Sequence, residues 1–315
     1  MKKKKVIVTG GAGFIGSNLA EELALRGHQV VIIDNLSTGN LENIQPVLPV
    51  GQVDFIEGSI TNLPLMQKAF SGADYVFHQA ALPSVPRSIE DPETTDSVNI
   101  TGTLNVLIAA RDNAVKKLVF ASSSSVYGDT PTLPKTEDMP PNPLSPYAVT
   151  KITGEYYCQV FTRIYNLKTV CLRYFNVYGP RQDPKSAYAA VIPLFINAVL
   201  SGKSPVIFGD GEQTRDFTFV KDVVEANIQA AESEVTGVFN LGNSQRITIS
   251  QLTKLIIDIT KNNNVKPVYK DPRPGDIVHS LADTSKAKAF GYNPRYSLEQ
   301  GLKETINSFN KGTAD

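Results

Sequence analysis

The sequence predicts an α/β protein: a doubly wound parallel sheet with a smaller C-terminal α/β domain. Two observations predict the sheet, because short apolar runs alternate with longer amphipathic segments and a glycine-rich turn follows the first run. A third predicts the second domain, since glycine and proline crowd the chain after about residue 176. We expect domains at residues 1–175 and 176–315, with interleaved boundaries.

Six apolar runs have the length and composition of buried strands: Val6–Thr9, Gln29–Ile33, Asp54–Ile56, Tyr75–His78, Leu118–Ala121 and Thr169–Tyr174. Helices are predicted near Ile15–Arg26, Leu63–Phe70, Val98–Asn113 and Pro146–Tyr165. Strands that alternate with helices form parallel sheets with helices on both faces. In the second domain we expect helices near Lys221–Glu232 and Ile249–Thr260, with a strand at Val238–Leu241 that the first domain could share.

Composition excludes several classes of protein. Lys plus Arg and Asp plus Glu each number 31, and a zero net charge argues against a general nucleic-acid binder. Two cysteines, Cys158 and Cys171, with three histidines favour neither a disulfide framework nor a metal site, and we expect buried thiols.

The longest apolar stretch, Ala190–Leu200, is 11 residues and too short to span a membrane. The lysines at the start lead into a strand rather than a removable segment, so we expect a cytoplasmic protein.

The turn after the first strand predicts a dinucleotide site. Gly10, Gly13 and Gly16 permit a tight turn and a close backbone approach to a pyrophosphate, which would lie at the N-terminus of the next helix. Asp34 ends the second strand, 18 residues past Gly16, where a carboxylate binds ribose hydroxyls. An acid there repels a 2′-phosphate, so the pattern favours NAD over NADP and indicates a Rossmann fold.

A second pattern predicts chemistry on an alcohol. Tyr147 and Lys151 lie one turn apart if Pro146–Tyr165 is helical. An ammonium group and a positive nicotinamide ring nearby would favour the phenolate, which makes Tyr147 a candidate general base. Four serines, residues 122–125, follow the fifth strand at the edge where open α/β sheets bind ligands.

Taken together, these motifs resemble the extended short-chain dehydrogenase/reductases, and within them the nucleotide-sugar 4-epimerases that act on UDP-glucose and UDP-N-acetylglucosamine. The resemblance covers essentially the whole chain, through the segments Thr9–Gly16, Asp34–Gly39, His78–Ala81, Ser122–Gly128, Tyr147–Lys151, Arg173–Arg181, Arg215–Phe217 and Arg273–Asp276. It implies NAD as cofactor, a UDP-sugar as substrate, and a homodimer formed by the helices near Thr101–Asn113 and Tyr147–Tyr165.

The resemblance also implies roles for single residues. Tyr147 acts as base and acid on the sugar 4-hydroxyl, and Lys151 holds the nicotinamide ribose. Ser123 hydrogen-bonds the 4-oxygen, with Ser124 as helper or substitute. The implied cofactor set is Gly10, Gly13, Phe14, Ile15, Gly16, Asp34, Asn35, Ser37, Thr38, Gly39, Ser59, Ile60, Gln79, Ala80, Ala81, Asn99, Ala121, Tyr147, Lys151 and Tyr174. Ser59 stands where the family usually has an aspartate beside the adenine.

On the substrate side the resemblance implies Arg215 and Arg273 as diphosphate clamps, because guanidinium groups suit phosphate oxygens. Asn176 reaches the diphosphate, Asp276 holds the uridine ribose, and Phe208 lies beside the uracil. The whole substrate set is Ser84, Val85, Arg87, Ser123, Ser124, Tyr147, Asn176, Ala190, Val191, Phe208, Arg215, Arg273, Asp276 and Ser280. We expect Leu82–Ser88 to be a loop.

The implied reaction is 4-epimerisation through a transient 4-keto sugar, and the residues separate it from its rivals. A dTDP-glucose 4,6-dehydratase has an Asp-Glu pair where this chain has Ser124 and Ser125, and the UDP-glucuronate decarboxylases have a glutamate there. A UDP-glucuronate 4-epimerase shares the serine run, but Asp183 would repel the sugar carboxylate. A non-enzymatic NAD sensor would not require Tyr147 and Lys151. Ser280 is small where a tyrosine would block a 2-acetamido group, so UDP-GlcNAc and UDP-GalNAc are also expected substrates.

Overall fold

The computed structural model describes residues 3–184, 190–272 and 278–311. Seven parallel strands form its central sheet, in the order β11-β6-β5-β4-β1-β2-β3. The strands are β1 (Lys5–Thr9), β2 (Gln29–Asp34), β3 (Gln52–Glu57), β4 (Tyr75–His78), β5 (Lys117–Ser123), β6 (Lys168–Tyr174) and β11 (Gly237–Leu241). This confirms the predicted doubly wound sheet.

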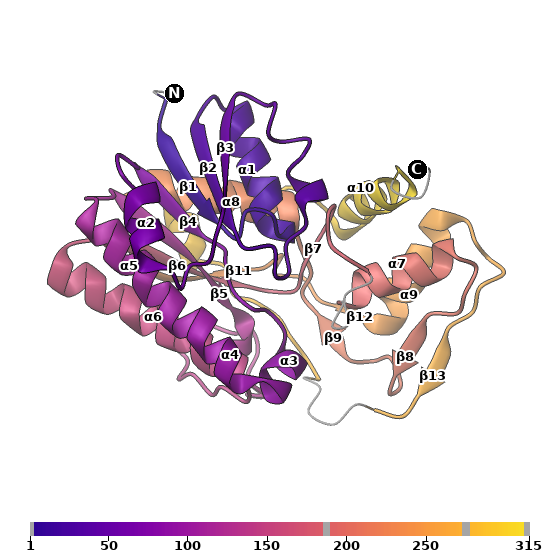
Figure 1. Ribbon diagram of the computed structural model, residues 1–315. Helices are drawn as coiled ribbons and strands as arrows, with labels where there is room; N and C mark the ends of the chain where they lie inside the picture. The colour runs from indigo at the N-terminus through magenta and orange to yellow at the C-terminus, as the bar shows by residue number, and fades with distance from the viewer. Residues whose placement is uncertain (1–2, 185–189, 273–277, 312–315) are drawn as a thin grey trace.

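Helices cover both faces of the sheet (Figure 1). Along β1, Val6 and Val8 face a core shared with α1 (Phe14–Leu25) and α8 (Val220–Glu232). Ile7 faces the opposite core, shared with α2 (Leu63–Ala69), α5 (Gly102–Asp112) and α6 (Pro146–Tyr165). Alternate residues therefore enter opposite layers, as the two-residue period of a strand requires.

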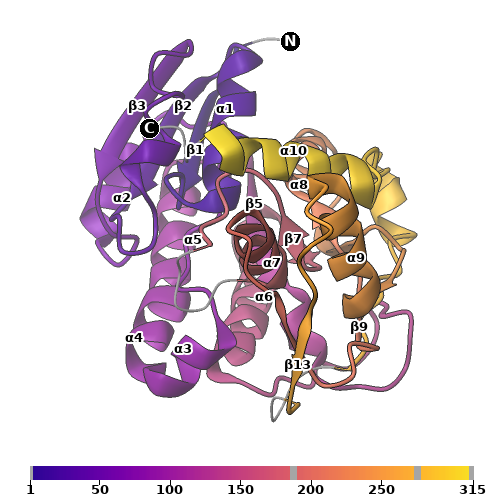
Figure 2. The same ribbon diagram turned by 90° about the vertical axis from the view of Figure 1, so that its right-hand side faces the viewer.

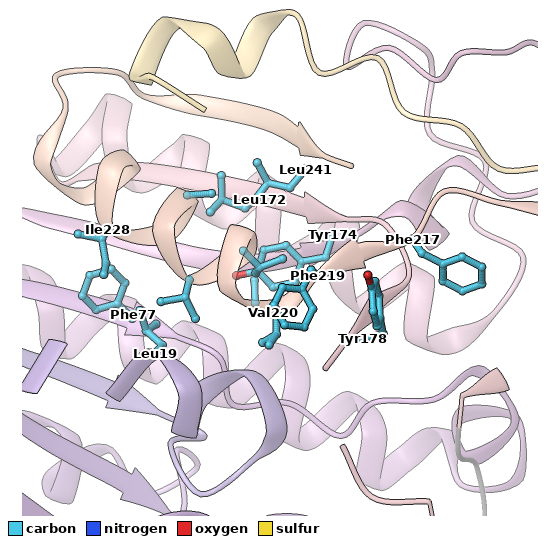
Figure 3. Packing of buried hydrophobic residues seen from close by; sticks show 14 of the residues in the cluster. Leu19, Phe77, Leu172, Tyr174, Tyr178, Phe217, Phe219, Val220, Ile228 and Leu241 are labelled. Atoms are coloured by element: carbon cyan, nitrogen blue, oxygen red, sulfur yellow. The ribbon is translucent and has the colours of Figure 1, made fainter. Parts of the chain in front are cut away.

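The seventh strand comes from the C-terminal half of the chain. β11 pairs in parallel with β6, with Gly237 opposite Val170 and Leu241 opposite Tyr174. In Figure 3 the side chains of Leu241, Leu172, Tyr174, Phe219 and Ile228 lie in one packed core. Residues beyond 176 therefore help to build the sheet as well as the second lobe.

The second lobe lies beside the carboxyl ends of the strands (Figures 1 and 2). It contains α7 (Val191–Leu200), α9 (Ile249–Thr260) and α10 (Leu298–Lys311), with short strand pairs. These pairs join β7 (Val177–Tyr178) to β10 (Thr218–Phe219), β8 (Val206–Phe208) to β13 (Val268–Lys270), and β9 (Thr214–Arg215) to β12 (Ile247–Thr248).

Two sequence predictions need correction near α5. The segment expected as a loop at 82–88 contains the start of α3 (Val85–Glu90), which Ser84 caps by accepting a hydrogen bond from the Arg87 amide. The helix expected from Val98 instead begins as a π-helical turn, Ser97–Thr101, directly after α4 (Pro92–Asp96). Proline in the first turn of α3 and of α4 is compatible with a helix, although it suggests a loop in sequence.

The remaining expectations concern absences. Cys158 and Cys171 are both free and buried, as predicted. Within the three described ranges, no three His, Cys, Asp or Glu side chains gather as metal ligands would. In the same ranges no helix is long and apolar enough to cross a bilayer.

Candidate active site

A cleft of about 730 Å³ opens at the carboxyl ends of the central strands. Its walls come from the turn after β1, the ends of β2, β4, β5 and β6, and the first two turns of α6. Every residue of the predicted cofactor set lines it except Asn99. A dinucleotide-sized cleft at this edge is the ligand position expected of an open parallel sheet.

The glycine turn leaves no room for side chains. Gly10 has φ +69°, and a Cβ there would lie 2.6 Å from the Ala80 backbone. A Cβ on Gly16 would lie 2.1 Å from the Gly10 carbonyl oxygen. Helix α1 begins just after Gly13 and has no side-chain cap, so its first amide groups remain available to an anion. The turn therefore fits a pyrophosphate.

Asp34 lies at the other end of the same wall and is largely buried. The Ala12 amide donates to one carboxylate oxygen at 2.9 Å, and the Leu36 amide donates to the other at 2.9 Å. These bonds hold the carboxylate next to Gly39, where an added Cβ would come within 2.9 Å of it. A ribose diol is the neighbour that such a fixed acceptor suits, so the residues fit the diphosphate and the adenosine ribose of NAD.

Helix α6 presents the predicted tyrosine and lysine to the cleft. Ser145 caps the helix by accepting from the Ala148 amide at 3.2 Å, and Pro146 follows at the first helical position. Lys151 is buried and donates to the Ala121 carbonyl at 2.8 Å. Its ammonium nitrogen lies 5.7 Å from the centre of the Tyr147 ring. The cap and the carbonyl bond together fix the pair against the end of β5.

Burial shifts both ionisable groups toward their neutral forms. It raises the pKa of Tyr147, while a hydrogen bond with Ser123 acts in the opposite direction. It lowers the pKa of Lys151 to about 8. In the protein alone burial outweighs the bond with Ser123, so the phenol stays neutral. The phenolate predicted from the sequence, which rests on the ammonium group and a positive nicotinamide ring, would therefore depend on the charge of that ring.

The serine run divides into distinct positions. Ser123 ends β5, bonds to Tyr147 and accepts a hydrogen bond from the Ser125 amide at 3.1 Å. Ser122 lines the cleft, Ser123 and Ser124 are outside its lining, and Ser124 starts a short 3₁₀ turn, Ser124–Tyr127. Of the two serines predicted to act, Ser123 is thus the one that the structure places at the phenol.

Three hydrogen-bonded side chains, two of them buried, support the floor of the cleft. The Tyr174 hydroxyl lies 3.1 Å from Gln79 Oε1 and 2.9 Å from Asn227 Nδ2, and Gln79 Nε2 donates to Asn227 Oδ1 at 3.0 Å. Tyr174 and Gln79 line the cleft, and Asn227 reaches them from α8. Sequence reasoning missed Asn227, because a polar residue inside a helix carries no signal of its distant partners.

Asn99 has a supporting position rather than one on the cleft wall. It is buried, accepts from the Leu82 amide at 2.8 Å, and donates to the Leu82 carbonyl at 3.1 Å. It also donates to the Thr150 hydroxyl at 3.1 Å. Asn99 therefore ties the chain after β4 to the catalytic helix.

Apart from Ser123 and Ser124, the predicted substrate residues fall into four groups. Ser84, Arg87, Tyr147 and Ala190 line the cleft. Val85 and Val191 follow Ser84 and Ala190 at the starts of α3 and α7, and Phe208 ends β8. Asn176, Arg215 and Ser280 gather around β9, where Arg215 donates to the Thr214 carbonyl at 3.0 Å and the Ser280 amide donates to the same carbonyl at 3.1 Å. Arg273 and Asp276 lie outside the described residues.

Several cleft residues had not been predicted: Ile33, Leu36, Asn40, Gly58, Leu82, Pro83, Val98, Ser122, Gln182 and Asp183. Most lie at strand ends or in the segments that follow them. Position at the carboxyl end of a strand was the available signal. Asp183 was noted in the sequence only as a group that would repel a sugar carboxylate, and the structure places it in the cleft wall.

Comparisons with known proteins show which proteins this chain is similar to. Residues 6–242 match the model of the NAD dependent epimerase/dehydratase family. A putative UDP-glucose 4-epimerase from Methanocaldococcus jannaschii is 40% identical, over 96% of this chain and 97% of its own length. A Methanobrevibacter ruminantium UDP-N-acetylglucosamine 4-epimerase, solved with UDP-N-acetylmuramic acid, is 44% identical with a TM-score of 0.96, covering 99% of this chain and 100% of its own. A Thermotoga maritima UDP-glucose 4-epimerase, solved with UDP-glucose, is 42% identical with a TM-score of 0.93, covering 98% and 99%.

Proposed function

The chain belongs to the NAD-dependent epimerase/dehydratase family, and we propose that it interconverts UDP-glucose with UDP-galactose and UDP-GlcNAc with UDP-GalNAc. Its relatives make it an NAD-dependent isomerase of the UDP-sugar 4-epimerase group. The observation that carries the finer proposal is the end of the cleft. Tyr147, Lys151 and Ser123 meet there, and the turn after β5 carries serines rather than acids.

In this proposal some residues of the chain bind the cofactor, and others transfer the proton or orient the substrate. The glycine turn would hold the pyrophosphate and Asp34 the adenosine ribose of the dinucleotide. Lys151, fixed by the Ala121 carbonyl, would hold the nicotinamide ribose. Bound NAD would supply the hydride chemistry at the sugar C4, with no net oxidation over the whole cycle. Tyr147 takes the proton of the 4-hydroxyl as C4 becomes a carbonyl and gives it back when the alcohol re-forms. Ser123 orients the 4-oxygen toward the phenol.

The sugar must present both faces to the same phenol during this cycle. We therefore place the firm contacts on the nucleotide and diphosphate, at Arg215, Asn176 and Phe208, and in the segment containing Arg273 and Asp276. The hexose ring itself needs few contacts, because a 4-keto sugar held tightly could not turn about its diphosphate linkage. Contacts to the nucleotide would thus supply the binding energy of the substrate, while the hexose at its other end stays free to turn.

Two related reactions are disfavoured by single positions. Expelling a 6-hydroxyl requires an acid beside the Tyr147 phenol, and Ser124 and Ser125 cannot supply one. A uronate substrate would bring its carboxylate toward the cleft wall that contains Asp183, and like charges in a partly enclosed site repel.

The test is direct incubation of the purified protein, with no NAD added, with UDP-glucose, UDP-GlcNAc or UDP-glucuronate, followed by separation of the epimers. We expect conversion of the first two and not of the third. Conversion of UDP-glucuronate alone would reassign the enzyme, and conversion of none would reject the proposal.

We propose that the small side chain of Ser280 leaves room for a 2-acetamido group, so that the site accepts N-acetylated as well as plain sugars. The Ser280→Tyr variant should reduce turnover of UDP-GlcNAc selectively, because the larger side chain occupies the space of the acetamido group. The matched Ser280→Ala variant should leave turnover of both sugars close to wild type. An equal loss on both substrates in Ser280→Tyr would reject this role.

We also propose a homodimer that uses the outer face of α6. Val149, Tyr156, Val160 and Ile164 are 45, 52, 43 and 68% exposed and recur at helical spacing. A contiguous apolar stripe of this kind marks an interaction surface. Light scattering should give twice the chain mass for wild type and a single chain mass for Ile164→Glu. A wild-type monomer would overturn the assignment.

A further inference from the structure

A buried ion pair lies beneath the catalytic end of the cleft. Glu155 on α6 is fully buried, and Arg173 on β6 is 3% exposed. Their contact is bidentate, with Arg173 Nε 2.8 Å from Glu155 Oε1 and Nη2 2.7 Å from Oε2. Removing two charges from water is unfavourable, and a buried ion pair is weak evidence for stability. The pair therefore calls for an explanation other than stability.

The pair contacts the catalytic strand through Ser122, whose hydroxyl donates to Glu155 Oε1. With this bond, three residues of α6 bond to three consecutive residues at the end of β5. Tyr147 bonds to Ser123, Lys151 to the Ala121 carbonyl, and Glu155 to Ser122, at successive turns of one helix face. The three bonds fix the register of α6 along β5.

Arg173 extends the contact into the rest of the sheet. Its guanidinium carbon lies 4.7 Å from the centre of the Tyr127 ring, at the end of the turn that follows Ser123. The Tyr127 hydroxyl donates to Asn240 Oδ1 of β11 at 2.7 Å. The pair is thereby connected to both sides of the serine run, before it at Ser122 and after it at Tyr127.

We propose that Glu155 and Arg173 are positioning residues that hold α6 and the end of β5 in the register at which Tyr147 and Ser123 converge on one substrate oxygen. The proposal rests on the proposed function. Glu155 lies eight residues from Tyr147, about 12 Å along the helix, so it acts through the other residues rather than on the substrate. A misplacement of about 1 Å at reacting atoms can lower a rate about 100-fold.

The main test replaces both charges. Single loss of Glu155 would leave a buried, unpaired guanidinium and could prevent folding, whereas Glu155→Met/Arg173→Met removes the pair together and should keep the melting temperature close to wild type. In this double variant we expect kcat for UDP-glucose to fall about 10- to 100-fold while KM and the bound NAD content stay near wild type. Wild-type kcat in the folded double variant would overturn the proposal.

A milder variant and a control complete the test. Ser122→Ala removes only the serine bond and should lower kcat severalfold with little change in melting temperature. Cys158→Ala is a buried change on the same helix, at a thiol that contacts Cys171 of β6 and takes no part in the three bonds to the end of β5, and it should lower the melting temperature and leave kcat unchanged. If kcat instead follows the melting temperature in all three variants, the pair is only structural and the proposal is wrong.

A measurement that needs no substrate tests the positioning role independently of the proposed function. A crystal structure of the double variant should show the bond between Tyr147 and Ser123 broken, and an intact bond would overturn the positioning role. Inactivity of the wild-type protein on every UDP-sugar would reject the proposed function and leave this structural comparison valid.

Discussion

Burial sets the protonation of the residues at the centre of the site. Tyr147 and Lys151 are both enclosed, and enclosure favours the neutral form of each: it raises the pKa of the phenol and lowers that of the ammonium group to about 8. Deprotonation of Tyr147 near neutral pH therefore depends on the hydrogen bond from Ser123 and on nearby positive charge. The tyrosine becomes a useful base when the cofactor is in place.

The first prediction concerns that base. Tyr147→Phe should lower kcat by at least about 1,000-fold, because the ring is retained and the group that moves the proton is lost. Binding of NAD, measured by retained cofactor after gel filtration, should be unchanged. Tyr156→Phe, an exposed tyrosine on the same helix, is the control and should keep wild-type turnover. Turnover in Tyr147→Phe within tenfold of wild type would contradict the assignment.

Prediction from sequence succeeds for single residues when the partners are local. Tyr147 and Lys151 are four residues apart on one helix, so their shared face follows from helix geometry. Asn227 and Glu155 are different: each also lies inside a helix, but its partners come from strands that are distant in sequence. No spacing rule connects them, and only the assembled sheet shows that they support the site.

At the scale of elements, the turn between β1 and α1 requires glycine at position 10 for two separate reasons. Gly10 needs a positive φ, and its missing Cβ makes room for the Ala80 backbone. Gly27 also has a positive φ, +83°, but nothing lies within 4 Å of the position of its Cβ. An alanine at Gly27 would therefore add only the strain of a positive φ, whereas an alanine at Gly10 would add that strain and a collision with the Ala80 backbone.

Gly10→Ala should destabilise the protein by at least about 2 kcal/mol more than Gly27→Ala, because only the first substitution forces two backbones apart. It should also weaken NAD binding, since the turn cannot stay closed around a diphosphate. Urea unfolding and NAD titration of the two variants measure the two effects. Equal destabilisation would show that the contact with Ala80 can relax.

The elements that sequence predicted poorly share a physical cause. The segment 82–96 contains prolines and polar residues typical of loops, yet forms α3 and α4, because Ser84 and Asp91 cap the two helices by accepting from amide groups. Glu57 and Gln52 extend β3 beyond the apolar run at 54–56, because backbone pairing with β2 continues after the hydrophobic residues end. Helix caps and the hydrogen bonds between strands involve backbone groups. The spacing of apolar residues therefore does not predict them.

At the scale of the whole molecule, one buried histidine makes the fold sensitive to acid. His78, at the end of β4, bonds to the Thr9 hydroxyl of β1 at 2.8 Å and to the Thr103 hydroxyl of α5 at 3.0 Å. It thus joins the sheet to the helix layer beside the cleft. Burial, with a smaller contribution from the Lys151 charge, lowers the pKa of His78 to about 3.

The sign of the effect follows from this shift. Between about pH 6.5 and pH 3 the unfolded chain binds a proton at His78 and the folded chain does not, so stability falls as the pH falls. This group alone should lower the free energy of unfolding by about 2 kcal/mol between pH 7 and pH 5. In His78→Gln that part of the slope should disappear, although the variant is less stable at pH 7. Urea unfolding at pH 7, 6 and 5 measures both slopes, and identical slopes would contradict the prediction.

The overall architecture followed from sequence up to the sixth strand, since each βα unit there is local. The sequence predicts the seventh strand, but it does not predict which strand of the sheet pairs with it. β11 pairs with β6 across more than 60 residues of intervening chain, and its five residues carry no signal of their partner. The second lobe is built from chain both between β6 and β11 and after β11, and its segment with Gln182, Asp183 and Ala190 reaches the cleft.

The central claim is that Tyr147 moves only the hydroxyl proton, while the hydrogen on C4 leaves and returns as hydride within one site. The most direct measurement uses UDP-glucose labelled with deuterium at C4, incubated with the purified protein in ordinary water and analysed by NMR and mass spectrometry. We predict UDP-galactose that retains the deuterium at C4. Loss of the deuterium to water, or no UDP-galactose, would contradict the account.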